Sequence, residues 1–107
     1  MKNRKNHSEL ELEILRNIEA NPNLTQRQMA EVLGMSLGKT NYLMKALLEK
    51  GLLKINNFKR SDNKLGYLYL LTPDGMETKK KLTILFLQRK SEEFDKLKKE
   101  MERINNL

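Results

Sequence analysis

The chain has 107 residues, a formal net charge of +7, 33% charged residues and no cysteine. This length supports one domain with a single modest core. Without cysteine, disulfides, thiol catalysis and cysteine-ligated zinc are excluded, and the one histidine, His7, is expected in a polar N-terminal tail. The longest apolar run, residues 84–87, is far shorter than the roughly 20 residues of a membrane span, and no secretory signal is evident. We therefore expect a cytoplasmic protein with no metal, no cofactor and no membrane partner.

The positive charge is concentrated in one third of the chain. Residues 34–66 hold seven basic side chains against two acidic ones. A polyanion is the natural partner of such a segment, although a solvated basic surface would have the same composition.

Two helix starts are marked near the N-terminus. Ser8 with Glu11 has the spacing of a capping box, and this first helix should end before Pro22, because the residue preceding a proline avoids the helical region. Thr25 with Gln28 has the same spacing and predicts the start of a second helix.

A third helix follows after a very short connection. Gly34 suits the left-handed position that ends a helix, Ser36 suits an N-cap, and Gly51 closes the third helix after Lys50. Only about three residues, 34–36, separate the second and third helices. This spacing is typical of a helix-turn-helix.

The third helix has two contrasting faces. An apolar stripe at helical spacing should pack on the first two helices: Thr40, Leu43, Met44, Leu47 and Leu48. The other face is polar, and the helix begins with no acidic residue and with a lysine, against the preference of the helix dipole. Such a start suits an approaching phosphate or base edge. We therefore predict that this helix enters the major groove of DNA.

Specific contacts follow from side-chain chemistry. Asn41 suits an adenine edge, Lys39 or Lys45 suits guanine or phosphate, and Tyr42 suits sugar or a thymine methyl. The second helix of this motif crosses the DNA backbone, so its start is expected near phosphate. A solvated lysine and a half-buried tyrosine remain the alternative for each residue alone. The expected DNA-binding residues of the two helices are Thr25, Gln26, Arg27, Ser36, Leu37, Gly38, Lys39, Asn41, Tyr42 and Lys45.

A β-hairpin should come next. Segments 52–58 and 67–71 are rich in strand-forming residues and are joined by the polar loop 59–66. As a wing, this loop would bring Lys59, Arg60 and Lys64 to flanking phosphate or the minor groove. The alternative is an ordinary solvated turn.

The last predicted helix runs from Pro73 to the C-terminus, with Thr72 as its cap. We expect a first apolar zone, Leu82, Leu85 and Phe86, to pack on the winged body. Further on, apolar residues recur at heptad spacing, interrupted by Lys90, and predict a homodimer: Leu87, Phe94, Leu97, Met101 and Ile104. The alternative is an amphipathic helix that folds back on its own domain.

Catalysis finds little support. Residues 34–40, GMSLGKT, approach a phosphate-binding loop, but three residues rather than four separate the glycines and a helix precedes them. The carboxylates lie on amphipathic helices among basic neighbours. We expect no catalytic residues and no enzyme activity.

Two runs carry a family resemblance: SLGKTNYL with KAL and EKGL in residues 36–52, and SDNKLGYLYLLTP in residues 61–73. Over roughly residues 8–90 the chain resembles MarR-like winged-helix regulators, most closely the small MarR-type regulators associated with bacterial exopolysaccharide (EPS) genes. The resemblance implies a homodimer that binds double-stranded DNA sequence-specifically and regulates transcription.

The expected fold is mainly α with a small β-hairpin, a winged helix-turn-helix followed by a long, coiled-coil-like C-terminal helix. The expected organisation is a basic flexible tail at 1–7, a DNA-binding domain at 8–72 and a dimerisation helix at 73–107. MarR-like dimers usually use helices at both ends of the chain. Here only a short tail precedes the first helix, so no effector pocket is implied.

Two other functions remain open from the residues. A winged helix can serve as a protein-interaction adaptor with only non-specific affinity for nucleic acid. Binding of RNA or single-stranded DNA would use aromatic stacking platforms, and the chain has only six aromatic residues, mostly at expected core positions.

Overall fold

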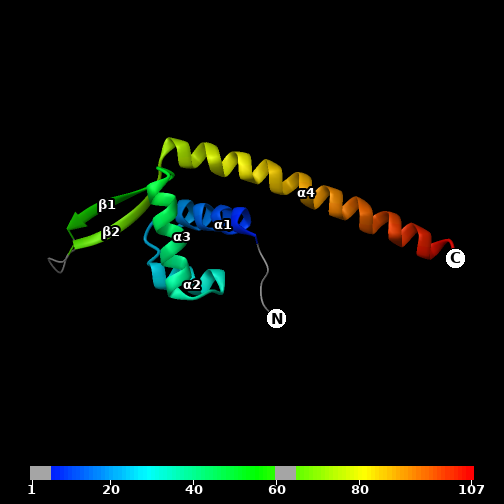
Figure 1. Ribbon diagram of the computed structural model, residues 1–107, viewed down its shortest axis with the longest axis horizontal. Coiled ribbons are helices and arrows are strands. Elements are labelled where there is room, and N and C mark those ends of the chain that lie inside the picture. Colours follow the sequence, from blue (N-terminus) through cyan, green and yellow to red (C-terminus); the bar gives the residue numbers. More distant parts are fainter. Residues whose placement is uncertain (1–5, 60–64) are drawn as a thin grey trace.

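The computed structural model describes residues 6–59 and 65–107. The elements in chain order are α1 (His7–Ala20), α2 (Gln26–Leu33), α3 (Leu37–Glu49), β1 (Leu53–Lys59), β2 (Leu65–Leu71) and α4 (Pro73–Asn105). Figure 1 shows three short helices packed together, a hairpin projecting to one side and α4 running past them. The expected fold class, mainly helical with one antiparallel hairpin and a long terminal helix, is confirmed.

The start of α1 differs from the prediction. Asn6 is the N-cap, and its Oδ1 accepts a hydrogen bond from the Glu9 amide at 2.9 Å. Ser8 therefore lies inside the helix, and the predicted Ser8–Glu11 capping box is wrong. Asn6 is as good a cap as serine, and it too has an acidic residue three positions on. His7 is accordingly the first helical residue and not part of a tail.

The caps of the next two helices are as predicted. Thr25 Oγ1 accepts from the Gln28 amide at 3.1 Å, and the Gln28 side chain accepts from the Thr25 amide at 3.0 Å. Gly34 ends α2 with a φ of 65°, in the left-handed region that favours glycine. Ser36 caps α3 through a bond from the Lys39 amide.

One apolar core joins the three short helices to the base of the hairpin. The predicted stripe of α3 is buried at Thr40, Leu43, Met44 and Leu47, with Leu48 half-buried. The core cluster contains Leu10, Ile14, Leu15, Ile18, Met29, Leu33, Leu43, Met44, Leu47 and Leu53.

The hairpin is longer than predicted. Its antiparallel register pairs Leu53 with Leu71 at the base and Lys59 with Leu65 at the far end. The expected strands at 52–58 and 67–71 thus become 53–59 and 65–71. Pairing into the predicted loop gives backbone N–H and C=O groups partners that a loop would not. The connection shrinks to residues 60–64, which lie outside the described residues.

The N-terminal part of α4 is fixed to the rest of the molecule. Thr72 caps the helix by accepting from the Gly75 amide, and the Thr72 amide donates to the Leu52 carbonyl. Lys79 Nζ lies 2.7 Å from Glu19 Oε2 on α1. A Cβ built on Gly75 would lie 2.0 Å from the Leu52 carbonyl oxygen, so only glycine permits this close approach.

The predicted packing of α4 is partly correct. Leu82 packs against the core and Phe86 is half-buried, but Leu85 is 43% exposed. Leu82 and Phe86 share a face because they are four residues apart, whereas Leu85 lies to one side of that face. We call residues 6–86 the body and residues 87–107 the arm. Figure 1 shows the arm extending beyond α1, and no helix in the described residues has the length and apolarity needed to cross a membrane.

Candidate nucleic-acid interface

The outer face of α3 is exposed and carries polar and aromatic side chains of the kinds that contact DNA. Tyr42 is 69% exposed, and Gly38, Asn41 and Lys45 are exposed on the same side of the helix. Ser36, Leu37 and Lys39 are exposed at its N-terminal end. All seven α3 residues expected at the interface therefore lie at the surface, opposite the buried stripe.

The N-terminal end of α3 leaves amide donors available. The Lys39 amide is satisfied by Ser36 Oγ, but the amides of Leu37 and Gly38 precede the first possible intrahelical bond. The first turn has no acidic residue. A Cβ added to Gly38 would meet nothing within 4 Å, so the space in front of this backbone is open. Such an end can bind a phosphate oxygen through backbone N–H groups.

The three expected contact residues at the start of α2 differ in their exposure to solvent. Thr25 and Arg27 are exposed, and the Thr25 hydroxyl also serves as the cap. Gln26 is half-buried, and its Nε2 donates to the Tyr69 hydroxyl at 3.0 Å. In this structure Gln26 therefore links α2 to strand β2 of the hairpin. This bond could not be expected from the residue pattern, because its partners are 43 residues apart.

The wing can be placed only in part. Lys59 is the last residue of β1 and pairs with Leu65. Arg60 and Lys64 lie outside the described residues. The described part of β1 offers further exposed polar side chains that the sequence did not single out, namely Lys54, Asn56 and Asn57.

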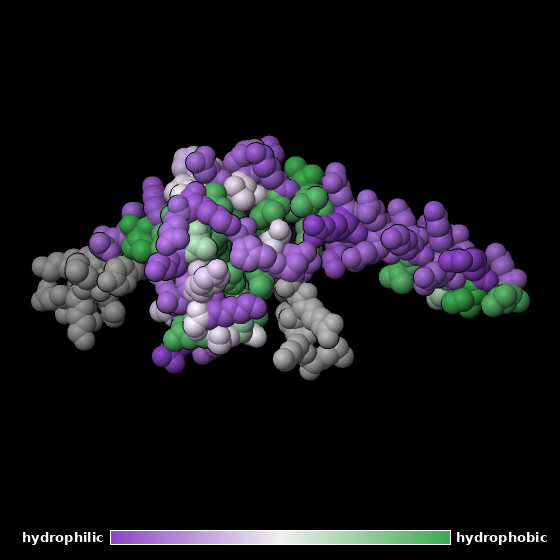
Figure 2. All heavy atoms as spheres, in the orientation of Figure 1, coloured by the Kyte–Doolittle hydropathy of each residue, from purple (hydrophilic) through white to green (hydrophobic). Residues whose placement is uncertain are grey.

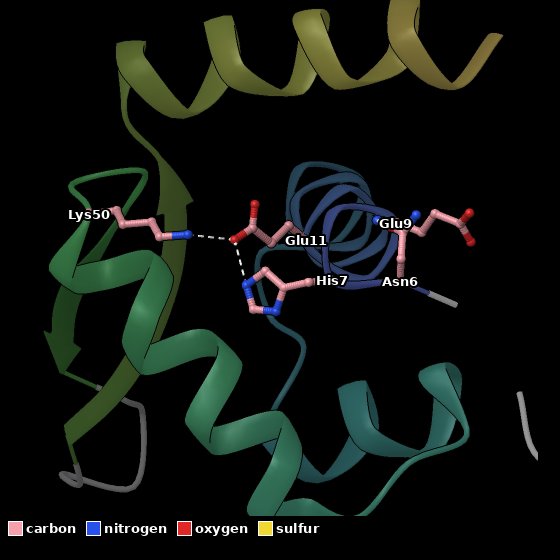
Figure 3. Close-up of polar contacts among 5 residues, drawn as sticks. All are labelled: Asn6, His7, Glu9, Glu11 and Lys50. Atoms are coloured by element: carbon pink, nitrogen blue, oxygen red, sulfur yellow. Dashed lines mark hydrogen bonds and ion pairs between the residues drawn. The ribbon is translucent and has the colours of Figure 1, made fainter. Parts of the chain in front are cut away.

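A buried ion pair fixes the C-terminal end of α3 to α1. Glu11 is only 8% exposed, and its Oε1 lies 2.6 Å from Lys50 Nζ and 3.0 Å from His7 Nε2. Figure 3 shows Lys50 and His7 reaching this carboxylate from different helix ends. A buried carboxylate needs such partners. The charge of Lys50, one of the seven basic residues of segment 34–66, is therefore partly compensated by Glu11.

Sequence reasoning missed this pair, although a signal was present. Glu11 occupies the apolar face of α1, four residues before Leu15 and seven before Ile18. A carboxylate on a buried face implies a cationic partner. The identity of that partner required the fold, because Lys50 is 39 residues away.

The heptad residues of α4 form a second exposed surface. Leu87, Phe94, Leu97, Met101 and Ile104 are 59–65% exposed, and we call this set the stripe. Figure 2 shows apolar side chains gathered along one edge of the arm. Every residue of the arm is exposed and, in the part of the chain that the structure describes, the arm extends away from the body, so the alternative that it folds back on its own domain is wrong.

The segment that resembled a phosphate-binding loop has another structure. Residues 34–40 form the C-cap of α2, the turn and the first residues of α3. Among the described residues there is also no group of three or more potential metal ligands.

Comparisons with known proteins agree with this architecture. Residues 7–54 match the family model of winged helix-turn-helix DNA-binding domains, which spans α1 to α3 and the start of β1. The fold is therefore a winged helix-turn-helix. A search of curated proteins gave no match.

Solved structures of MarR-family regulators share the fold across most of the chain. A MarR/EmrR family regulator from Acinetobacter sp. ADP1 is 20% identical with a TM-score of 0.60, covering 91% of this chain and 75% of that one. PcaV from Streptomyces coelicolor is 20% identical with a TM-score of 0.56, covering 92% and 79%. A MepR variant from Staphylococcus aureus, bound to an oligodeoxyribonucleotide, is 19% identical with a TM-score of 0.60, covering 94% and 76%. The winged helix-turn-helix of this chain is thus similar to that of MarR-family proteins.

Proposed function

We propose that this protein is a non-enzymatic transcriptional regulator that binds double-stranded DNA sequence-specifically. The observation that carries the proposal is the exposed, polar, acid-free start of α3, on a body that matches DNA-binding winged helices. That a MepR variant of the same fold was solved with an oligodeoxyribonucleotide supports it. Exopolysaccharide genes, suggested by the sequence resemblance, are the proposed targets.

The proposed docking puts α3 in the major groove. Asn41 reads an adenine edge, and Lys45 contacts guanine or phosphate from the next turn of the helix. The open backbone at Gly38 allows a phosphate to approach the N-terminal amides. Thr25 and Arg27 contact the DNA backbone from α2, and Lys59, Arg60 and Lys64 contact it from the wing.

Selection from a randomised pool of duplexes tests sequence-specific reading without knowledge of the operator. Wild-type protein should enrich one motif, and Asn41→Ala should enrich a motif that is relaxed at one base pair, with affinity lowered by about 1–3 kcal/mol. Lys64→Ala is the matched backbone variant, and it should weaken all duplexes similarly while preserving the motif.

The selection also separates this proposal from the adaptor function. An adaptor would bind duplexes weakly and enrich none of them. The proposal that α3 recognises the base sequence is wrong if wild-type protein enriches no motif, or if Asn41→Ala enriches the wild-type motif unchanged.

A further inference from the structure

Within residues 6–59 and 65–107, no other element packs on the arm. Every residue from Leu87 to Leu107 is exposed, and α4 remains helical to Asn105. The stripe places five large apolar side chains on one side of this helix, each 59–65% exposed. The stability of a helix in a protein comes mainly from packing of its apolar face.

We propose that a second copy of this chain covers the stripe, with the two arms side by side as a parallel, in-register, two-stranded coiled coil. The interface is confined to the arm and uses no N-terminal helix. This goes beyond DNA binding, and every measurement below is made without DNA, so failure of one proposal is distinguishable from failure of the other.

The spacing of the stripe assigns the heptad. With Leu87, Phe94 and Met101 at the a positions, Leu97 and Ile104 occupy d positions. Phe94 to Ile104 then gives four consecutive apolar layers. Exposed apolar side chains of this stripe also border a shallow surface hollow, which a knob from a neighbouring helix would fill.

Lys90 occupies the remaining d position, at the body end of the stripe. Its ammonium group lies 5.2 Å from the centre of the Phe86 ring and 3.5 Å from Glu93 Oε2 on the same helix. The charge of Lys90 therefore interacts with residues of its own helix. The apolar layers thus begin after Lys90, and the coil extends from there to the C-terminal end of α4.

The flanking charges favour a second copy in the parallel orientation. In this heptad Glu93 and Glu100 occupy g positions and Lys98 an e position, all exposed. Parallel pairing places each g residue near the e residue five positions later in the other helix, so Glu93 faces the partner's Lys98. Two-fold symmetry forms this attractive pair twice.

The antiparallel orientation reverses this balance. Aligning the same four apolar layers antiparallel pairs Phe94 with the partner's Ile104 and Leu97 with the partner's Met101. It then places g against g and e against e, so Glu100 would lie near the partner's Glu100 and Lys98 near the partner's Lys98. Like charges at these positions oppose pairing. Parallel arms also leave both bodies at the same end of the coil, where both copies of α3 can approach one duplex. Antiparallel arms would place the bodies at opposite ends.

The mass of the protein in solution tests whether a second copy of this chain covers the stripe. The full chain should have about twice its 12.6 kDa monomer mass by light scattering. Leu97→Asp should weaken self-association by at least about tenfold, equivalent to 1.4 kcal/mol, while Lys99→Asp on the opposite side of the arm should leave the mass unchanged. Far-ultraviolet circular dichroism checks that the body remains folded. A monomeric wild type, or a Leu97→Asp variant that remains fully dimeric, would overturn the proposal.

A charge substitution tests the orientation by the sign of its effect. In the parallel coil Glu93→Lys places lysine against the partner's Lys98 and should weaken the dimer about threefold or more; adding Lys98→Glu should restore it. In the antiparallel coil of the same four layers Glu93 lies opposite the partner's Leu107, so Glu93→Lys would leave the dimer unweakened. A dimer that is equally strong or stronger would therefore contradict the parallel orientation.

Cross-linking gives an independent readout because the chain has no cysteine. In the parallel coil Ile104→Cys faces its own copy and should form a disulfide dimer on mild oxidation, since paired d positions are close enough for an S–S bond. In the antiparallel coil Ile104 faces the partner's Phe94. Cross-linking would then require a mixture of Ile104→Cys and Phe94→Cys proteins, and that result would overturn the parallel orientation.

Discussion

The body and the arm are stabilised in different ways. In the body, apolar side chains from three helices and the hairpin pack into one core, and no described buried side-chain polar atom lacks a hydrogen-bond partner. In the arm, all residues are exposed and the helix has apolar side chains facing solvent. The difference teaches that one continuous helix can have two environments: its first half completes the fold, and its second half presents an exposed apolar surface.

The largest effect is expected from truncating the core of the body. Leu47 is fully buried on α3, so Leu47→Ala should lower the free energy of unfolding by about 2–5 kcal/mol through lost burial and a residual cavity. Urea denaturation followed by circular dichroism measures this change.

The same truncation in the arm is the matched control. At concentrations low enough for monomers, Leu97→Ala should leave the free energy of unfolding of the body unchanged, because its side chain is 65% exposed. Equal losses for Leu47→Ala and Leu97→Ala in dilute monomer would remove the distinction between body and arm.

A second prediction concerns the junction that fixes α4 to the body. Gly75→Ala introduces a Cβ that would lie 2.0 Å from the Leu52 carbonyl oxygen, so the backbone must shift. We expect a loss of stability of about 1–3 kcal/mol. Gly38→Ala is the matched glycine in α3; its Cβ meets nothing, and a gain of about 0.5–1 kcal/mol is expected. Thermal unfolding of both variants measures whether the stability falls in Gly75→Ala and rises in Gly38→Ala. Equal changes in stability would contradict the close approach of Gly75 to Leu52.

The buried ion pair should contribute less. Lys50→Ala leaves Glu11 with His7 as its remaining described partner, and because the Lys50 side chain is 51% exposed we expect a loss of about 1 kcal/mol. A double-mutant cycle with Glu11→Gln measures the coupling directly. Strictly additive losses would mean that the two side chains do not interact.

The smallest effect is expected at the link between α2 and the hairpin. Tyr69→Phe removes only the hydroxyl that accepts the bond from Gln26, which should cost about 0.5–1.5 kcal/mol. Gln26→Ala should cost a similar amount, and the double variant little more than either alone. Additive losses in chemical denaturation would show that the bond does not form in solution.

The local features of the body could be predicted from the sequence because they depend on near neighbours. The caps at Thr25, Ser36 and Thr72 each involve a partner three residues away. The start of α1 was misplaced because Asn6 and Ser8 are equivalent caps, and only the folded chain distinguishes them. The strand ends were misplaced because backbone pairing continues through Lys59, Leu65 and Gly66, which had been expected in the loop.

Long-range contacts could not be predicted, because the sequence does not show which distant side chains meet. The bonds from Lys50 to Glu11 and from Gln26 to Tyr69 both join residues about 40 positions apart. The exposed outer side of α3 could be expected from its contrast with the helix's buried apolar face, and its exposure is confirmed. Contact of that face with DNA remains a prediction.

The most direct test of the central claim is a competition titration. Wild-type protein is titrated at several salt concentrations against a labelled duplex from upstream of its own gene, or one enriched by selection, with scrambled DNA as competitor. Affinity for every duplex should fall as salt rises, because phosphate contacts release counterions, while the preference for the specific duplex persists with two protomers bound per site. Equal affinity for the specific and scrambled duplexes at every salt concentration would contradict sequence-specific reading by α3.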